Sequence, residues 1–387
     1  MELSFLHPLL RRPGPWASVV VDTSRHSEDA AKQTELRNRA AARELLRLGA
    51  DQRTVRAVAD RLAAEPTSGS PAGRALFATE GRVLLEAELA SAPVPVETTW
   101  SALPRLTPLL SLRSECPDIL LVLIDRTGAD LELCDEHGRH ALAGAQGPQG
   151  REHGHRTVPG DRYEWHYQHR VEDSWQRTAQ VVADEVARRH ACTPECVVAL
   201  AGDPRERHEV LRRLPRPLGP AVVELRTGGR APGGADHALD EELELVRAQV
   251  AAEHTDQALT DLVAGRTRDP ATGRARRAES VGRTTEGVPE VLRAARERRL
   301  ATLLLDPAAP DTARTVWTGT DPLHLSAERG EVRALGEPYP RPARADDALL
   351  RAAIALDAEA LAVPPSGLGP VGGVGALLRW PQPTAVA

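Results

Sequence analysis

Short runs of β-branched and aliphatic residues recur along this chain and limit it to folds built on several sheets. Each run is six to eight residues long and is bounded by polar, glycine or proline residues, as expected of buried strands. Segments with apolar residues three or four apart, which are typical of helices, separate the runs. This alternation predicts an α/β (α+β) chain of mixed sheets packed with helices. The clearest strands are 16–22 (WASVVVD), 118–125 (DILLVLID), 196–201 (CVVALA) and 300–305 (LATLLL).

Length and punctuation predict three domains. A chain of 387 residues exceeds what one hydrophobic core usually serves. Prolines interrupt the chain four times between residues 93 and 108, and the glycine-rich stretch 227–234 is typical of an interdomain linker. We therefore expect an N-terminal α/β domain over 1–108, a middle domain over 109–226 and a C-terminal α/β domain over 235–387.

The middle domain contains a loop followed by a long helix. Residues 141–160 have no apolar period and are dense in glycine and proline, so we expect a flexible loop that buries nothing. Asp161 and Glu164 provide acceptors for the first-turn amides of a helix, which we expect over 161–189. Its apolar face is formed by Val171, Trp175, Val182 and Val186.

The start of this helix combines flat rings with cations. Two of the three tyrosines of the chain lie here, beside histidines and arginines and directly after a basic loop. Such an element suits stacking on bases and contact with phosphates. The alternative is that the rings pack on the domain below and the histidines are solvated. The candidate RNA-binding residues of this segment are Arg156, Arg162, Tyr163, Trp165, His166, His169 and Arg170.

The net charge of −6 argues against a wholly basic nucleic-acid binder, so RNA contacts must come from local patches. Residues 266–283 contain six arginines and little apolar content. A run of this kind is usually a solvated loop, and in a ribosome-bound factor it is a reasonable phosphate contact. Its candidate RNA-binding residues are Arg274, Arg276 and Arg277.

Several other functions find no support in the sequence. No apolar run could span a bilayer and no signal peptide is evident, so we expect a cytoplasmic protein without a membrane partner. Cys192 and Cys196 resemble half of a zinc site, but no second ligand pair follows. We expect buried free thiols and no metal. The chain has no phosphate-cradling loop and no nucleophile elbow, so we expect no cofactor and no nucleotide hydrolysis.

The C-terminal third carries a specific pattern. It comprises 287–292 (GVPEVL), 303–305, 349–355, 360–363 and 372–380 (GGVGALLRW). These motifs resemble the third domain of archaeal and eukaryotic class I release factors and of Pelota. The order hairpin, loop, long helix and buried strand resembles the middle domain of the same superfamily. The resemblance is to its bacterial branch, covers most of the chain, and implies a three-domain factor that enters the ribosomal A site with its middle domain toward the peptidyl-transferase centre.

One departure from the family pattern bears on function. Release factors carry Gly-Gly-Gln just before the long helix, where it positions a water on the peptidyl-tRNA ester. Here the corresponding place ends in Gly160 and Asp161, and a carboxylate cannot donate as an amide does. Gln146 lies fifteen residues before Asp161 and is the candidate catalytic residue of a variant motif on the flexible loop. The loop residues that would take part are Gly144, Ala145, Gly147, Gly160 and Asp161.

The leading hypothesis is a ribosome-binding translation factor that occupies the A site of idle or stalled ribosomes, for hibernation or rescue, without an intact Gly-Gly-Gln motif. The alternative is an enzyme, a peptidyl-tRNA hydrolase or peptide release factor that uses Gln146. A third option is a stress-linked protein that binds only protein partners. The resemblance implies as partners the ribosomal RNA of the A site and peptidyl-transferase centre, peptidyl-tRNA, and a translational GTPase such as elongation factor Tu.

Overall fold

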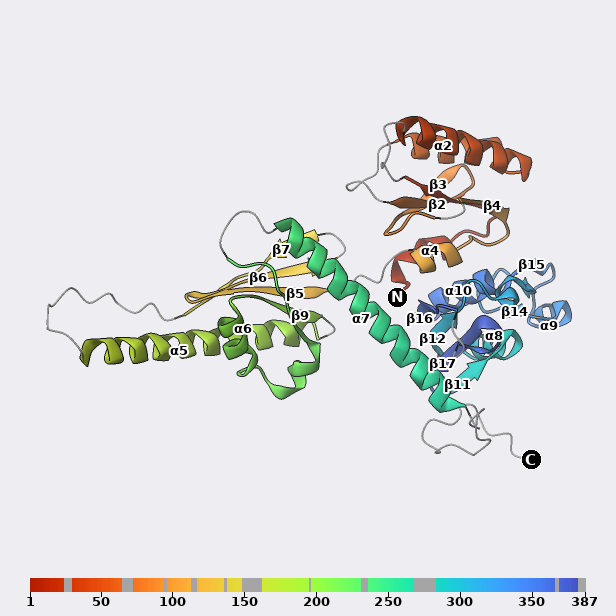
Figure 1. Cartoon of the computed structure of the whole chain (residues 1–387). Helices are drawn as coiled ribbons and strands as arrows, with labels where there is room; N and C mark the ends of the chain where they lie inside the picture. Colours follow the sequence, from red (N-terminus) through yellow and green to blue (C-terminus); the bar gives the residue numbers. More distant parts are fainter. Residues whose placement is uncertain are drawn as a thin grey trace, which may run out of the picture. The chain divides into compact units, whose positions relative to one another are not determined.

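The computed structural model describes residues 1–23, 30–64, 72–93, 96–112, 117–135, 138–147, 162–194, 196–230, 236–266, 283–365 and 369–381; over 162–174 it describes the backbone alone. The chain forms two compact units, drawn in Figure 1. Unit 1 comprises 1–114 with 253–387, and unit 2 comprises 115–252. The expected α/β (α+β) class with several sheets is confirmed. The division into three domains stays a prediction, because the N-terminal and C-terminal parts share unit 1.

The N-terminal part of unit 1 is an antiparallel sheet covered by two helices. Its strand order is β3-β2-β1-β4. One face packs on α2 and α3, where Val19 and Leu76 meet Leu45 and Val58. The strands are β1 (Trp16–Asp22), β2 (Gly73–Thr79), β3 (Arg82–Leu89) and β4 (Glu97–Ser101); the helical segments are η1 (Ser4–Leu6), α1 (His7–Leu10), α2 (Ala30–Arg47), α3 (Gln52–Ala63) and α4 (Thr107–Leu112).

The C-terminal part of unit 1 is a mixed sheet in the order β11-β17-β12-β16, with a small sheet, β14-β13-β15, beside it. Only β12 and β16 pair in parallel. The strands are β11 (Thr284–Glu286), β12 (Leu300–Leu305), β13 (Thr315–Thr318), β14 (Leu325–Ser326), β15 (Arg341–Arg344), β16 (Glu359–Ala362) and β17 (Val374–Leu378). The helical segments are α8 (Val288–Arg296), η3 (Pro310–Ala313), α9 (Arg329–Ala334), α10 (Ala345–Ala355) and η4 (Val371–Gly373).

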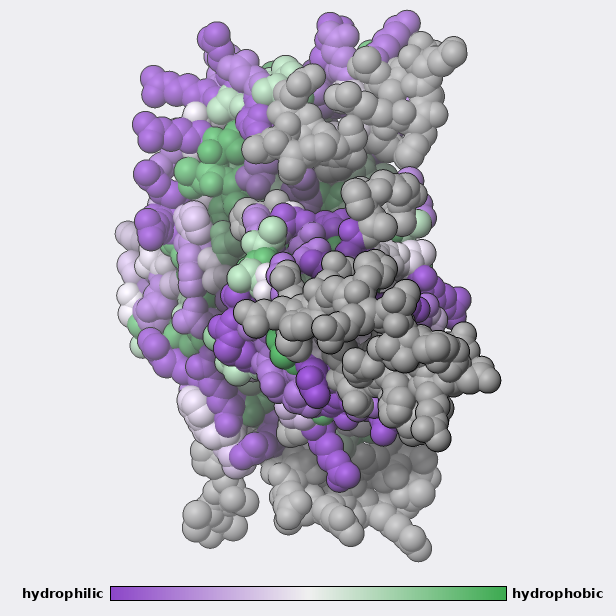
Figure 2. Space-filling view, turned by 90° about the vertical axis from the view of Figure 1, so that its left-hand side faces the viewer, coloured by the Kyte–Doolittle hydropathy of each residue, from purple (hydrophilic) through white to green (hydrophobic). Residues whose placement is uncertain are grey.

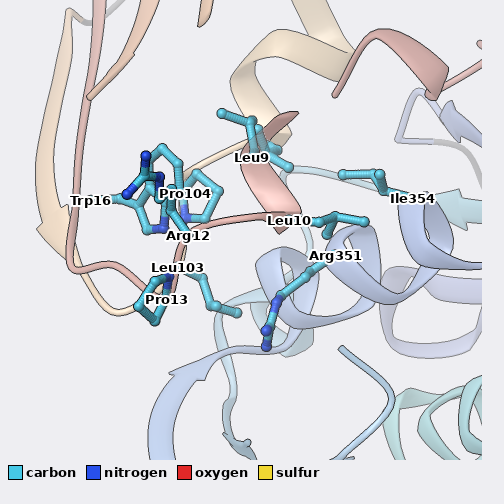
Figure 3. Close-up of a pocket in the computed structure, with 10 residues that line it drawn as sticks. Leu9, Leu10, Arg12, Pro13, Trp16, Leu103, Pro104, Arg351 and Ile354 are labelled. Atoms are coloured by element: carbon cyan, nitrogen blue, oxygen red, sulfur yellow. The ribbon is translucent and has the colours of Figure 1, made fainter. Parts of the chain in front are cut away.

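The two parts of unit 1 share one hydrophobic core, to which Phe77 and Leu109 contribute from the N-terminal side and Leu349 from α10. A buried ion cluster adds to this contact: Arg105 donates to Asp346 (2.6 Å) and to Asp347 (3.2 Å) at the start of α10. A small pocket remains between the segment after α1 and α10. Figure 3 shows its lining residues, with Arg12, Pro13, Trp16 and Pro104 on one side and Arg351 and Ile354 on the other.

Unit 2 is a sheet between helices, in the order β10-β9-β5-β6-β7, with β8 paired to β6. Alternate residues of β5 face opposite sides: Val122 packs with α5 and α6, and Leu121 packs with the first half of α7. The strands are β5 (Ile119–Asp125), β6 (Gly128–Asp135), β7 (Gly138–Ala141), β8 (Ala145–Gln146), β9 (Val197–Gly202) and β10 (Val222–Glu224). The helical segments are α5 (Arg162–Cys192), α6 (Pro204–Leu211), η2 (Arg216–Ala221) and α7 (Asp236–Gly265).

The structure corrects two expectations about irregular segments. The stretch 141–147, expected to be the start of a flexible loop, contains β8 and is attached to the sheet. The glycine-rich stretch 227–234, expected to be an interdomain linker, is fixed to unit 2 over its described part: the backbone N and the hydroxyl of Thr227 donate to Glu242 (2.9 and 2.6 Å). Glycine and proline here mark tight local geometry, which composition alone does not distinguish from a linker.

The face of the molecule drawn in Figure 2 is predominantly polar over its described residues. Figure 2 shows hydrophilic side chains over most of the described surface on the face it presents, with smaller hydrophobic areas between them. None of the helices in the described ranges is both long and apolar enough to cross a membrane.

Candidate functional site

The hairpin turn between β5 and β6 is organised by the carboxylate of Asp125. Its Oδ1 atom accepts from the backbone N of Thr127 (2.7 Å) and of Gly128 (3.0 Å) and from the Thr127 hydroxyl (2.7 Å). An aspartate at a strand end thereby holds its own turn. Burial raises the pKa of Asp125, but hydrogen bonds from Thr127 and Arg230 outweigh it and lower that pKa below its ordinary value. Asp125 is therefore a carboxylate at neutral pH.

Arg230 clamps this turn to the body of unit 2. Its Nε and Nη2 atoms donate to the two oxygens of Asp130, both at 2.9 Å, and its Nη1 atom donates to Asp125 (2.8 Å) and to the Thr127 hydroxyl (2.9 Å). The Arg230 side chain is 17% exposed. The bond to Asp130 is the main reason that the pKa of Arg230 is raised. A two-pronged pair of this kind fixes direction as well as distance.

Strand β8 holds Gln146 against the same turn. Gln146 pairs with Gly128 and Ala145 with Ala129 across the β6–β8 ladder. The backbone N of Gly147 then donates to the carbonyl of Thr127 (2.9 Å). Ala145 is buried, whereas Gln146 is exposed. The premise that Gln146 sits on a flexible loop is therefore wrong for its backbone, and its catalytic role stays a prediction.

Glycines allow the segment around Gln146 to lie flat on its neighbours. A Cβ on Gly147 would come within 2.0 Å of the Thr178 hydroxyl of α5, and one on Gly144 within 2.7 Å of the carbonyl of Ala129. A Cβ on Gly128 would meet the carbonyl of Ala145 at 2.1 Å. The glycines read in the sequence as loop residues are thus sites of close backbone approach.

Among the described side chains of α5, those of its later turns pack on the sheet. The cluster that it shares with the sheet is formed, from α5, by Trp175, Ala179, Val182, Ala183, Val186 and Ala187. At 1.5 Å per residue, the backbone from Arg162 to Thr178 spans about 24 Å. Figure 1 shows this first part of α5 running on past the end of the sheet. The helix therefore forms an arm that projects from unit 2.

Carboxylates also gather where β5 and β9 end, because the carboxyl ends of parallel strands meet at one edge of a sheet. Asp203 follows β9 and caps α6 by accepting from the backbone N of Arg205 (2.9 Å). Glu206, in the first turn of α6, accepts from Nε of Arg126 (3.3 Å). Burial, followed by the charge of Asp203, raises the pKa of Glu206. No group of acidic, histidine or cysteine side chains able to hold a metal ion occurs among the described residues.

The predicted RNA-binding residues fall in three places. Those at 162–170 lie on the arm of α5, where the backbone is described and the side chains are not: Arg162, Tyr163, Trp165, His166, His169 and Arg170. Outside the described residues lie Arg156, Gly160, Asp161, Arg274, Arg276 and Arg277. The loop residues Gly144, Ala145 and Gly147 surround Gln146 as described above.

The three thiols within the described residues differ in environment, which corrects the expectation of buried thiols; Cys116 lies outside the described residues. Cys134 and Cys196 are buried, and Cys192 is exposed. Burial raises the pKa of Cys134 to about 11 and also raises that of Cys196. Arg230 was missed because it stands in a glycine- and proline-rich stretch with no motif around it. No signal near Arg230 in the sequence identifies it, because its partners Asp125 and Asp130 lie 105 and 100 residues earlier.

A protein-family model matches the central part of this chain. Residues 118–268 match the family model described as bacterial archaeo-eukaryotic release factor family 2. The resemblance to the bacterial branch of the release-factor and Pelota superfamily is confirmed. The matched segment runs from β5 through α5 to the end of α7 and therefore includes the turn, Gln146, the arm and Arg230.

Two kinds of relative accompany this match. An uncharacterized protein of Mycobacterium tuberculosis, found in two strains, is 29% identical over 393 residues, covering 98% of this chain and 97% of its own. Among solved structures, an archaeal translation termination factor is 17% identical over 97% of this chain and 96% of its own, with a TM-score of 0.25. Pelota of Archaeoglobus fulgidus is 14% identical over 79% of each chain, with a TM-score of 0.36.

Proposed function

We propose that this chain is a ribosome-binding translation factor that occupies the A site of idle or stalled ribosomes and does not hydrolyse peptidyl-tRNA. It serves in hibernation or rescue and acts in the cytoplasm. The family match over 118–268 supports action on the ribosome. The arm of α5 supports insertion of a narrow, rigid element into a confined site, because helical backbone is satisfied along its length and needs no partner.

The observation that carries this proposal is the distance between Gln146 and the start of α5. The release-factor motif stands directly before the long helix, at the tip of the arm. Gln146 is held at Gly128, and its neighbour Gly147 lies against Thr178. Thr178 is sixteen residues into the helix from Arg162, or about 24 Å along its axis. A glutamine at the base of the arm is poorly placed to align water on an ester that the tip would reach.

In this proposal the rings and cations at 162–170 stack on bases and contact phosphates near the peptidyl-transferase centre. Arg156 and the arginines at 274–277 add phosphate contacts, which supply affinity without reading sequence. A translational GTPase such as elongation factor Tu would meet the C-terminal part of unit 1. No metal or cofactor has a role in this function.

The alternative remains a peptidyl-tRNA hydrolase that uses Gln146, and the exposed side chain of this residue favours keeping it. One experiment separates the two. Purified stalled ribosomes carrying labelled peptidyl-tRNA are mixed with wild-type protein or with Gln146→Ala, and both peptide release and co-sedimentation are measured. We expect co-sedimentation without release for both proteins.

Release by the wild type that is lost in Gln146→Ala would refute our proposal and establish the hydrolase. Gln249→Ala is the matched control, because Gln249 is an exposed glutamine on α7, away from the turn. Absence of both release and co-sedimentation would leave only the third option, a protein that binds other proteins.

A further inference from the structure

The β2–β3 turn of unit 1 brings together arginines that are far apart in the sequence. Arg12, which follows α1, forms an ion pair with Glu80 of the turn (2.7 Å). The next residue, Gly81, lies so close to α3 that a Cβ on it would stand 3.0 Å from the Cβ of Arg53. Arg82 begins β3 directly after the turn. Three separate segments thus place guanidinium groups around one turn.

This turn is rigid. Glu80 and Gly81 have φ angles of +51° and +77°, the left-handed pair of a tight hairpin. The backbone N of Gly81 donates to the Thr54 hydroxyl of α3 (2.8 Å), and the Thr79 hydroxyl donates to the carbonyl of Pro15 (2.7 Å). The arginines around the turn are therefore carried by a fixed backbone, which reduces the entropy lost when they bind a partner.

The small sheet of the C-terminal part extends the same surface. Arg341 of β15 donates to the carbonyl of Pro13, the residue after Arg12 (3.4 Å). Tyr339, two residues earlier, is 81% exposed. The loop that carries it is anchored by Glu337, which is buried and accepts from the backbone N (2.7 Å) and hydroxyl (2.8 Å) of Thr320. A flat ring is thus presented to solvent from an anchored loop beside a cation.

This surface is positively charged, whereas the chain as a whole carries a net negative charge. Its members, all exposed, are Arg11, Arg12, Arg53, Arg56, Arg82 and Arg341 with Tyr339, and together we name them the arginine surface. The carboxylates described among them are Glu80, paired with Arg12; Asp60, which is 3.9 Å from Arg56; Asp51, which caps α3; and Glu337, the buried anchor of the loop that carries Tyr339. Six guanidinium groups against four carboxylates make this area basic on a chain whose net charge is −6.

We propose that the arginine surface binds RNA, with its guanidinium groups on backbone phosphates and Tyr339 stacked on an unpaired base. The planar fork of arginine matches two phosphate oxygens, and an aromatic ring beside cations is the usual platform for single-stranded RNA. The proposal deepens the proposed function, because ribosomal RNA would be the natural partner, but its test does not need a ribosome.

The test uses the full chain and a fluorescently labelled 20-nucleotide poly-uridine RNA, with affinity measured by anisotropy over a series of salt concentrations. The variant Arg53→Gln/Arg82→Gln/Arg341→Gln removes three cations of the surface. The control Arg39→Gln/Arg43→Gln/Arg47→Gln removes three exposed arginines from α2 and lowers the net charge equally. Melting curves of both variants should match the wild type, because all six side chains are exposed.

We expect the slope of log affinity against log salt to become shallower by about 2 in the surface variant, at about 0.7 for each phosphate contact on a single strand. Its affinity at low salt should fall at least about tenfold, and the control should stay within about twofold of the wild type. Tyr339→Ala should weaken binding about tenfold and Tyr339→Phe should not, since the ring does the stacking.

Two outcomes would overturn the proposal. Equal losses in the surface variant and the control would show that only net charge matters, and no RNA binding by the wild type would point to an acidic protein as the partner instead. Ribosome co-sedimentation is read separately: if the wild type binds RNA through this surface but does not pellet with ribosomes, the proposed function fails and the arginine surface stands.

Discussion

Replacing Arg230 by glutamine should loosen the turn that holds Gln146 without unfolding unit 2. The substitution removes the fork to Asp130 and one of the four hydrogen bonds to Asp125. Hydrogen bonds to charged groups contribute about 1.5–3 kcal/mol when buried, and exposed ion pairs less than about 1 kcal/mol. Asp125 and Asp130 are 41% and 51% exposed, so water replaces part of what is lost. We expect a local cost of about 1.4 kcal/mol, a factor of about ten in the opening equilibrium.

Hydrogen exchange of single amides measures this cost. The amide of Gly147 donates to Thr127 across the clamped turn, and the amide of Leu225 donates to Leu200 at the opposite edge of the sheet (2.8 Å). Protection of Gly147 should fall about tenfold in Arg230→Gln, while protection of Leu225 stays unchanged.

The matched control for this experiment is Arg266→Gln. Arg266 makes a similar fork, to Glu286 at 2.8 and 2.7 Å, and its side chain is 19% exposed, but it lies in unit 1. It should leave Gly147 unaffected. Unchanged protection of Gly147 in Arg230→Gln would refute the idea that Arg230 holds this turn.

Two further predictions concern the buried carboxylates of α10, and a third concerns the thiols. Burial, and then the charge of Asp346, raise the pKa of Asp347 to about 7, so this group makes the wild type lose stability as pH rises from about 4 to about 7 and not beyond. The stability of Asp347→Asn relative to the wild type, measured by thermal melts, should therefore increase over this pH range by at most about 1.4 kcal/mol per pH unit and stay constant above it. Asp346→Asn should instead destabilise at all pH values above about 4, because Arg105 loses its 2.6 Å partner, and a gain in melting temperature would contradict this. Thiol labelling of the native protein should fall by one rapidly reacting group in Cys192→Ser and by none in Cys134→Ser, and slow labelling of Cys192 would refute its exposure.

Strands and helices with strong apolar patterns were predictable almost to the residue. β1 spans Trp16–Asp22 and β12 spans Leu300–Leu305, as the sequence predicts, because each is buried and must carry an unbroken apolar pattern. The small sheet of β13, β14 and β15 was not predicted. Its strands are two to four residues long and one of them contains Pro342, so they lack the alternation that identifies a strand.

The candidate site was less predictable, for a physical reason. A glycine in a sequence can indicate either a flexible backbone or a place where two backbones come into close contact. Only the neighbouring backbone in the structure distinguishes the two. Gly144 and Gly147 predicted a flexible loop, and both proved to be places where a side chain would collide with the sheet or with α5. The hydrogen-bond partners of Arg230 lie about 100 residues away in the sequence, so no local sequence pattern predicts these ion pairs.

The anchoring of α5 at one end makes the arm behave as a cantilever. Its support is the cluster around Trp175, Ala179, Val182 and Val186, and the helix backbone from Trp175 to Arg162 is about 20 Å long. A tilt of about 5° at the support would move the tip by about 2 Å, which exceeds the tolerance of a contact between a ring and a base. A substitution that changes side-chain volume in this cluster should therefore cause a larger displacement at Arg162 than at the cluster itself. The packing of unit 2 thus determines how accurately the start of α5 is positioned.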